Sequence, residues 1–564
     1  MSITRIIGGT LTKTATTGNI DIRATEGNVD FVAAQHNIWH GEEEGIIYHD
    51  YEPLHKEDRL SNSINVRLNL FFDGTQNNKT NTEAKQAISK NHQAYLNEGN
   101  KNDDSFENDY TNIARGYDAI NPDEENQVAV YIEGIGTENL NSDSVLKGVA
   151  RGEGDTGIEA KVSKGCMDAA LIMWGKGYQI KNINILYVNV YGFSRGAAAA
   201  RHFIHVASKK AIYSKLNKIG KDQYQYFITP DYLFKDSSYQ IHLTLKDSAF
   251  MDKYGYFGAC LLKQGMKIME IKFNFVGVYD TVASHGLYHG NDVSDLKLDS
   301  ITKARYVFQI ASDDEYRENF DLSNIKSAGL RGFELTLPGV HSDIGGSYLN
   351  NKDELSVLDN LETSDDAQHR KTAQNLKDKE YDSFKKIVVD EGWYSDMQLT
   401  KEFFHEKDFD PFTSWYENHF NYGLVGRRKL FNTYDKIPLN FMIERSKDYE
   451  VFYSTRLLKN AEINDSFMES IYNQLMVYFK ECAKLHNGYV RIFNESKTNF
   501  NSLSKEYTDK LEKIHYSKYI KLEDLKKLRK NYLHWSVKSN LLGLSARKDG
   551  ALPQEKRKRE IHNG

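Results

Sequence analysis

A serine stands between two glycines in the stretch Gly192-Phe-Ser-Arg-Gly196, which fits the pattern G-x-S-x-G. The β-rich run 185–191 leads directly into this stretch, and the alanines at 197–200 open a helix-like run directly after it. Strand, sharp turn and helix in this order are typical of a nucleophile elbow, in which a strained turn exposes a serine hydroxyl. An ordinary strand–helix turn that contains serine is the alternative. We predict that Ser194 is a nucleophile suited to attack on an acyl ester.

A serine nucleophile needs a base that takes its proton and an acid that orients the base. In the α/β-hydrolase fold the chain order is serine, acid, histidine. Asp280 ends the apolar run 273–280, and His341 follows the apolar run 333–340. Polar residues just past the carboxyl ends of parallel strands lie where such sheets place their sites. We therefore predict Asp280 as the acid and His341 as the base.

Three other residues compete for these two roles. His285 and His289 are alternative bases, but they follow directly after the acid and we interpret them as solvated or wall residues. Asp343 is an alternative acid. It lies two residues from His341, so we expect it to cap or brace that loop, and the choice between the two aspartates stays open.

An oxyanion hole needs two amides that point at the reacting oxygen. One is expected from Arg195, the residue after the nucleophile. The other is expected from Gly74 or Thr75, in the glycine turn after the apolar run 64–72, with Asp73 as a supporting residue.

Two further motifs are weaker. The glycine turn also resembles the D-x-D-G-T motif of haloacid-dehalogenase phosphatases, but Phe71 holds the position of the nucleophilic aspartate. Gly152-Glu-Gly-Asp-Thr-Gly157 spells the dinucleotide pattern G-x-G-x-x-G, but the preceding strand-like run ends many residues upstream. We interpret it as a glycine-rich wall of the site. No metal and no cofactor is expected.

The bulk properties exclude several classes of protein. The 564 residues have a formal net charge of −6 and a mean hydropathy of −0.62, so a polyanionic partner such as nucleic acid is not expected. No apolar run approaches the roughly 20 residues that span a bilayer. The three cysteines are scattered, and the first residues lack the apolar segment of a cleavable signal peptide. We expect synthesis in a reducing cytoplasm and export by another route.

The pattern of apolar runs predicts three parts. Residues 1–60 contain a nine-residue repeat of short strands, which we expect to dock on the protein's own body or on a partner. Residues 61–350 alternate strand-like and helix-like runs, which predicts an α/β fold, a mostly parallel sheet with helices on both faces. Within it, residues 210–271 are an insertion and a candidate lid. Residues 351–564 are predicted to be mainly helical, with a membrane or partner surface.

Two apolar groups in this last part could contact lipid, although packing in the protein's own core is the favoured interpretation for both. One is an aromatic cluster within 403–422. The other is a basic amphipathic helix in the stretch 501–564, which carries sixteen Lys or Arg against eight Asp or Glu. Its apolar face consists of Leu522, Leu525, Leu528, Tyr532 and Trp535.

Taken together, the motifs between 64 and 350 resemble those of the type VI secretion phospholipase effectors of the first lipase-effector class. The matching stretches are Asn69-Leu-Phe-Phe-Asp-Gly-Thr-Gln-Asn-Asn78, the glycine-rich region 134–157, Gly192-Phe-Ser-Arg-Gly196, Gly277-Val-Tyr-Asp-Thr281 and Leu337-Pro-Gly-Val-His-Ser-Asp-Ile-Gly-Gly346. The resemblance implies an α/β-hydrolase domain that hydrolyses acyl esters of bacterial membrane phospholipids, with Ser194, Asp280 and His341 as its triad. It also implies delivery from the producer's cytoplasm into a rival cell and a cognate immunity protein.

Two other functions remain open at this stage. The chain could be mainly a cargo module that docks on a secretion spike through residues 1–60, with an inactive or secondary hydrolase core. It could instead be a soluble esterase or thioesterase without a membrane role. Peripheral contact with a membrane is expected only for the phospholipase.

Overall fold

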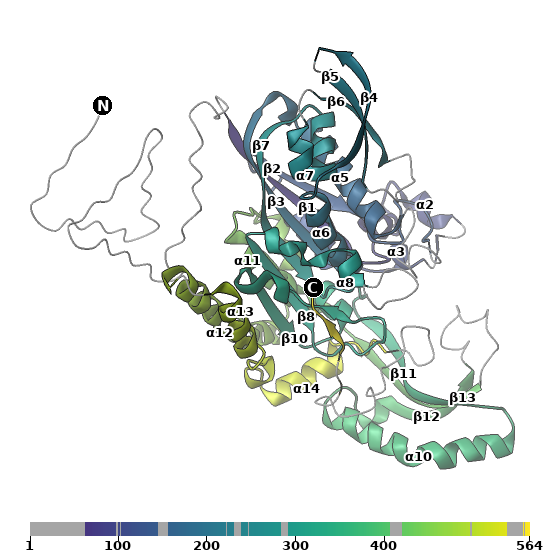
Figure 1. Ribbon diagram of the computed structural model, residues 1–564. Coiled ribbons are helices and arrows are strands. Elements are labelled where there is room, and N and C mark those ends of the chain that lie inside the picture. Colours follow the sequence, from purple (N-terminus) through teal and green to yellow (C-terminus); the bar gives the residue numbers. More distant parts are fainter. Residues whose placement is uncertain are drawn as a thin grey trace, which may run out of the picture. The chain divides into compact units, whose positions relative to one another are not determined.

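Six parallel strands form the central sheet of the computed structural model (Figure 1), in the order β10-β8-β7-β3-β1-β2. They are β1 (Ile64–Phe72), β2 (Gln127–Ile132), β3 (Asn182–Phe193), β7 (Lys267–Tyr279), β8 (Tyr306–Ser312) and β10 (Gly332–Leu337). Every residue of β8 is buried, as expected for a parallel strand with both faces covered. The predicted parallel α/β fold is confirmed.

The structure describes residues 63–97, 100–101, 103–144, 156–221, 223–230, 239–245, 248–283, 292–405, 420–496, 499–537, 557 and 559–564. The expected β-repeat within 1–60, most of the G-x-G-x-x-G stretch, and His285 and His289 lie outside these residues. So do four aromatic residues of the 403–422 cluster, Phe409, Phe412, Trp415 and Tyr416. All described residues belong to one compact unit, Leu54–Gly564.

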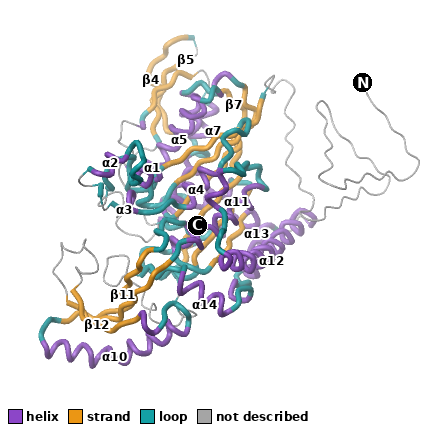
Figure 2. Tube along the Cα trace, turned by 180° about the vertical axis from the view of Figure 1, so that it is seen from behind, coloured by secondary structure: helices purple, strands orange, loops and turns teal. Residues whose placement is uncertain are grey.

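The two faces of the sheet are covered by different helices. One face packs on α5 (Ile158–Gly175), α6 (Arg195–Val206) and α7 (Ala249–Lys263). The other packs on α4 (Asn112–Ala119), α11 (Lys436–Lys447) and α12 (Ser466–Ser496), of which α4 and α11 lie in front of the sheet in Figure 2. Neighbouring side chains of one strand alternate between these cores, because successive residues of a strand point to opposite faces.

A row of buried asparagines crosses three strands of this sheet. The Asn189 amide donates to Asn69 Oδ1 at 2.9 Å, and the Asn274 amide donates to Asn189 Oδ1 at 3.1 Å. Each amide would be left unsatisfied if its strand moved by one residue. The row therefore fixes the register of the strands that end at the predicted site.

The insertion between α6 and β7 forms an antiparallel sheet of β4 (Ile212–Gly220), β5 (Gln223–Thr229) and β6 (Ile241–Leu245), followed by α7. It begins after α6 has run back from Ser194, and it ends where Lys267 pairs with Asn182 at the start of β3. The insertion thus lies at the amino end of the strands (Figure 1), opposite the edge that carries Ser194. The interpretation of this insertion as a lid stays a prediction.

The residues after 350 are mainly helical, as expected, but they also form an antiparallel sheet that the charge-rich sequence did not reveal. Its strands are β11 (Lys352–Thr363), β12 (Leu399–His405) and β13 (Phe420–Leu430). The helices are α10 (Ala367–Asp390), α11, α12, α13 (Phe500–Leu511) and α14 (Leu522–Asn531). Most of these elements share one apolar core with the α4 face of the central sheet.

The described chain also has shorter α-helices and strands. They are α1 (Lys79–Ala84), α2 (His92–Leu96), α3 (Asp104–Glu107), α8 (Asp292–Asp295), α9 (His341–Gly345), β9 (Leu322–Ser323) and β14 (Ile561–His562).

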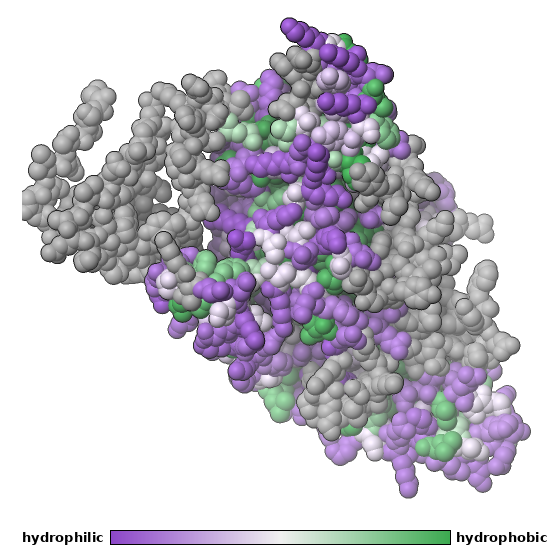
Figure 3. Space-filling view, viewed as in Figure 1, coloured by the Kyte–Doolittle hydropathy of each residue, from purple (hydrophilic) through white to green (hydrophobic). Residues whose placement is uncertain are grey.

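The amphipathic helix near the C-terminus is docked on the protein itself. Leu525, Leu528, Tyr532 and Trp535 are buried, and only Leu522 of the predicted apolar face is exposed. The described surface in Figure 3 is mostly hydrophilic, with small scattered apolar patches. Among the described helices, none is long and apolar enough to cross a bilayer.

The docking of α14 can be tested with two leucines of the same helix. Leu528→Ala should destabilise the protein by about 2–5 kcal/mol, because it removes a fully buried side chain and leaves a cavity. The matched change Leu522→Ala removes a side chain that is 62% exposed and should alter stability by no more than about 0.5 kcal/mol. Thermal and urea unfolding measure both. Equal effects of the two changes would contradict the docked position.

Candidate active site

Ser194 occupies a sharp turn between β3 and α6. Its φ of 58° and ψ of −129° lie in a region that non-glycine residues rarely adopt. A Cβ added at Gly192 would lie 2.4 Å from the Gly196 carbonyl oxygen, and one added at Gly196 would lie 2.1 Å from the Asp73 carbonyl oxygen. Both glycines of the G-x-S-x-G motif are therefore required by close backbone approach, as a nucleophile elbow needs.

Backbone hydrogen bonds join this turn to the end of the neighbouring strand β7. The Ser194 N–H donates to the Tyr279 carbonyl at 3.1 Å, and the Val282 N–H donates to the Ser194 carbonyl at 3.3 Å. Asp280 lies between Tyr279 and Val282 in the sequence, and its φ of 44° is also positive. The chain thus holds Ser194 and Asp280 side by side at the carboxyl edge of the sheet.

His341 reaches the same place from β10. It begins α9, and its Nδ1 lies 2.5 Å from Asp280 Oδ2. Its ring packs against Phe193, the residue before Ser194, with 4.6 Å between ring centroids, and against Phe320 at 5.0 Å. The structure therefore brings together the three residues that the sequence predicted as a triad.

The charges in this group assign the proton on His341. Burial alone would raise the pKa of Asp280, but the charge of Arg559 and the hydrogen bond from His341 hold that pKa well below its ordinary value. An ionised carboxylate only accepts hydrogen bonds, so His341 Nδ1–H is the donor and Nε2 carries the lone pair. Burial lowers the pKa of His341 and outweighs the opposing effect of Asp280. The lowered pKa favours the neutral imidazole.

Asp343, the alternative acid, pairs with a different histidine. It accepts the backbone N–H groups of Val340 and His534, each at 3.0 Å, and its Oδ1 lies 2.7 Å from His534 Nδ1. Asp343 thus braces the first turn of α9 and ties it to the residues after α14. The structure places Asp280, not Asp343, beside His341.

The glycine turn after β1 lies next to the elbow and contains Asp73. The buried Asp73 carboxylate accepts hydrogen bonds from Gly74 N–H at 2.7 Å and from the hydroxyls of Thr111 and Tyr131, both at 2.6 Å. Burial outweighs these hydrogen bonds and raises the pKa of Asp73 to about 6. Asp73 therefore organises this turn and is not in contact with His341.

The same bonds distinguish the two residues proposed for the second oxyanion amide. The Gly74 amide already donates to Asp73, whereas the Thr75 amide has no acceptor among the described residues. The Arg195 Nε donates to Thr75 Oγ1 at 2.8 Å, which holds the turn against the start of α6. Thr75 and Arg195 are thus held together next to Ser194.

Four polar residues around the His341–Asp280 pair were missed by the sequence reasoning. The Ser312 N–H and hydroxyl donate to Asp280 Oδ1 at 2.8 and 3.0 Å. Arg559 forms an ion pair with the same carboxylate. Glu315 accepts a hydrogen bond from the backbone N–H of His341 at 3.2 Å, and it forms an ion pair with Arg317. Ser312 is the last residue of β8, a strand that we did not predict, and Arg559 stands in the basic stretch 501–564, which carries no sequence signal for the site.

A six-stranded parallel sheet with a strained serine turn at its carboxyl edge, and a histidine–aspartate pair next to that turn, is the arrangement of the α/β-hydrolase class. A family model describes the relatives of this sequence more closely. The model of the type VI secretion system (T6SS) phospholipase effector Tle1-like catalytic domain matches residues 66–367. The chain belongs to this family, so its catalytic domain is of the lipase type.

One solved structure has a similar fold over most of both chains. "Structure of the Tle1 effector bound to the VgrG spike from the Type 6 secretion system" is similar to 90% of this chain and 95% of that one, at 18% identity and a TM-score of 0.51. A crystal structure of an uncharacterized protein from Pseudomonas aeruginosa covers 52% of this chain and 43% of its own, at 17% identity and a TM-score of 0.27. Among curated proteins, none matches the sequence.

The crowding at Gly196 predicts a large effect of one added methyl group. Gly196→Ala should destabilise the protein by about 1–3 kcal/mol and lower hydrolytic activity, because its Cβ meets a carbonyl oxygen that no rotamer change can move. Gly175→Ala is the control, since a Cβ at this helix end meets nothing within 4 Å. Thermal unfolding and an esterase assay measure both variants. Normal stability and activity of Gly196→Ala would contradict the described elbow.

Proposed function

We propose that this protein hydrolyses acyl esters of membrane phospholipids by a serine mechanism, as an antibacterial effector. Membership of the phospholipase effector family supports the substrate class. The observation that carries the mechanism is the hydrogen bond between His341 and Asp280 next to the strained turn at Ser194.

The geometry supports a definite role for each residue. Asp280 keeps the proton of His341 on Nδ1, so Nε2 is the atom that takes the proton from the Ser194 hydroxyl. The Ser194 oxygen then attacks the ester carbonyl, and His341 returns the proton to the leaving alcohol. His341 then takes a proton from a water molecule, and this water attacks the acyl-enzyme and releases the fatty acid from Ser194.

Two amides are suited to stabilise the negative oxygen of the tetrahedral intermediate. The Arg195 N–H lies at the start of α6, where the helix dipole favours negative charge. We assign the second amide to Thr75 in preference to Gly74, since the Gly74 N–H is bound to Asp73. Donors of this kind are fixed before the reaction and need no rearrangement as charge develops.

The proposal extends to delivery. The Tle1 effector of similar fold was solved bound to the VgrG spike. We propose that this chain also docks on a secretion spike, through residues 1–60, and is carried into the periplasm or membrane of a target cell. A cognate immunity protein would protect the producer, because the substrate lipids occur in its own membranes.

Ser194→Ala should abolish the release of fatty acid from phosphatidylethanolamine and phosphatidylglycerol vesicles, because the attacking oxygen is gone. The wild type should produce free fatty acid and lysolipid, measured by mass spectrometry. Ser163→Ala, which changes a buried helical serine in α5, is the matched control and should stay active. Full activity of Ser194→Ala would refute the serine mechanism. Hydrolysis of short esters alone, with vesicles left intact, would restrict the protein to a soluble esterase.

Two aspartate-to-asparagine changes distinguish the proposed acid from its alternative. Asp280→Asn should lower kcat by about 10⁴-fold, because the amide no longer holds the required His341 tautomer. Asp343→Asn should retain activity within about tenfold, since Asp343 contacts His534 and not His341. Steady-state kinetics on a short acyl ester measure both, with thermal unfolding as the check on folding. The reverse order of activities would assign the acid to Asp343.

A further inference from the structure

The Asp280 carboxylate has a charged partner from a segment remote in sequence. Arg559 Nη1 donates to Asp280 Oδ1 at 2.6 Å, and Nη2 donates to Asp280 Oδ2 at 2.9 Å. The same guanidinium donates to the Ser312 hydroxyl at 2.9 Å and, through Nε, to the Phe320 carbonyl at 2.6 Å. The Arg559 side chain is 6% exposed and that of Asp280 is fully buried. The contact is therefore a two-pronged, desolvated ion pair.

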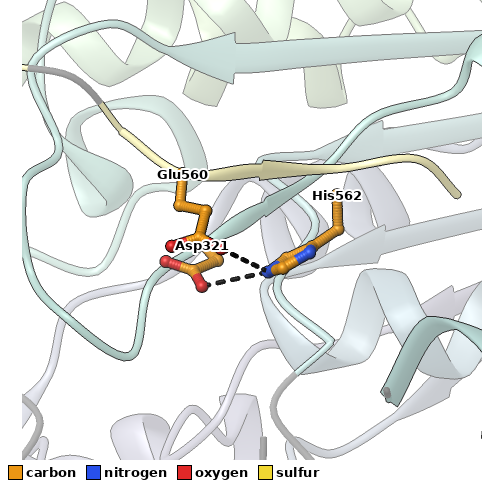
Figure 4. Close-up of side chains that lie close together, drawn as sticks. All are labelled: Asp321, Glu560 and His562. Atoms are coloured by element: carbon orange, nitrogen blue, oxygen red, sulfur yellow. Dashed lines mark hydrogen bonds and ion pairs between the residues drawn. The ribbon is translucent and has the colours of Figure 1, made fainter. Parts of the chain in front are cut away.

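Arg559 is held in this place by the docking of the segment 559–564, which contains β14. This strand pairs in parallel with β9, where Leu322 N–H donates to the Glu560 carbonyl and Asn324 N–H donates to the His562 carbonyl, both at 2.9 Å. Side chains add to the pairing, since His562 Nε2 lies 3.1 Å from Asp321 Oδ2 and 3.8 Å from Glu560 Oε1 (Figure 4).

β9 in turn is joined to the loop of the acid. The Ser323 N–H donates to the carbonyl of Thr281, the residue after Asp280, at 2.9 Å. The segment 559–564 therefore rests on the part of the chain that carries the carboxylate. A change in its docking would directly alter the surroundings of Asp280.

The ion pair offsets the energetic cost of burying the Asp280 charge. In the resting enzyme His341 is neutral, so the Asp280 charge would have no opposite charge in a fully buried position. An isolated buried carboxylate is costly, and burial alone would raise its pKa. The Arg559 guanidinium supplies the opposite charge and binds both carboxylate oxygens, which also fixes the plane of the carboxylate relative to His341.

We propose that Arg559 is a positioning residue of the hydrolase: docking of the segment 559–564 on β9 supplies the guanidinium that keeps Asp280 ionised and aimed at His341. The inference rests on the proposed triad mechanism. Arg559 touches neither the nucleophile nor the ester in this role, and it acts through Asp280 alone.

The proposal is tested with Arg559→Met and Arg559→Lys in the full chain. Arg559→Met should lower kcat on a chromogenic short acyl ester by about 10- to 100-fold, the effect typical of losing a partner that orients a functional group. KM should change little. Arg559→Lys keeps the charge but cannot span both oxygens in the same way, so its kcat should lie between those of Arg559→Met and the wild type.

The pH dependence separates a positioning role from a merely structural one. Activity requires ionised Asp280 and neutral His341. Loss of the Arg559 charge raises the pKa of Asp280, and it also leaves the carboxylate free to raise the pKa of His341. Both effects move the acidic limb of the kcat/KM profile to higher pH, by about one unit in Arg559→Met. Glu315 and Arg317 also face His341 and are unchanged in every variant.

A control variant and a measurement of stability make the outcome decisive. Ile561→Thr changes an exposed side chain of β14 and should behave as wild type. Thermal unfolding reports any loss of stability. If Arg559→Met and Arg559→Lys keep the wild-type kcat and acidic limb, or lose stability alone, the positioning role is overturned while an inactive Ser194→Ala still supports the serine mechanism. An active Ser194→Ala would overturn the proposed function itself.

Discussion

A negative charge on Asp280, in a fully buried position, is the constraint on which the arrangement of this edge of the sheet depends. The carboxylate is satisfied by the Ser312 N–H and hydroxyl, by His341 and by Arg559. These donors come from the end of β8, the start of α9 and the segment that contains β14. Removal of one partner from a buried charged group costs far more than its bond contributes, so the three elements must all be in place.

Backbone strain is concentrated at the same edge. Ser194 and Asp280 both have positive φ angles, and each such residue costs on the order of 1–3 kcal/mol. The hydrogen bonds of Ser194 to Tyr279 and Val282 continue the pairing of β3 and β7 past the strand ends. The parallel sheet thus holds the two unfavourable turns, at Ser194 and Asp280, beside each other. The row of buried asparagines, which fixes the register of β1, β3 and β7, stabilises the same arrangement from within the sheet.

The features that sequence could predict are those with a local signal. The glycines around Ser194, and the apolar runs that end at Asp280 and lead into His341, mark the strand ends directly. The edge of the sheet at which an insertion lies carries no such signal, so the sequence did not place the insertion at 210–271 relative to Ser194. Arg559 lay beyond prediction because 279 residues separate it from Asp280 and its basic neighbours look like an ordinary solvated run. The proposed preference for the Thr75 amide over the Gly74 amide depends on one hydrogen bond of Asp73, which the sequence does not reveal.

The parallel pairing of β14 with β9 has a consequence for the timing of biosynthesis. A ribosome that has made the chain as far as residue 537 has already made the serine, the aspartate and the histidine of the site, but not Arg559. Until the residues that follow have emerged and docked, the aspartate lacks its guanidinium partner. On the proposed mechanism, a nascent lipase is therefore poorly active beside the membranes of the cell that makes it, and full activity appears only after synthesis has passed residue 559.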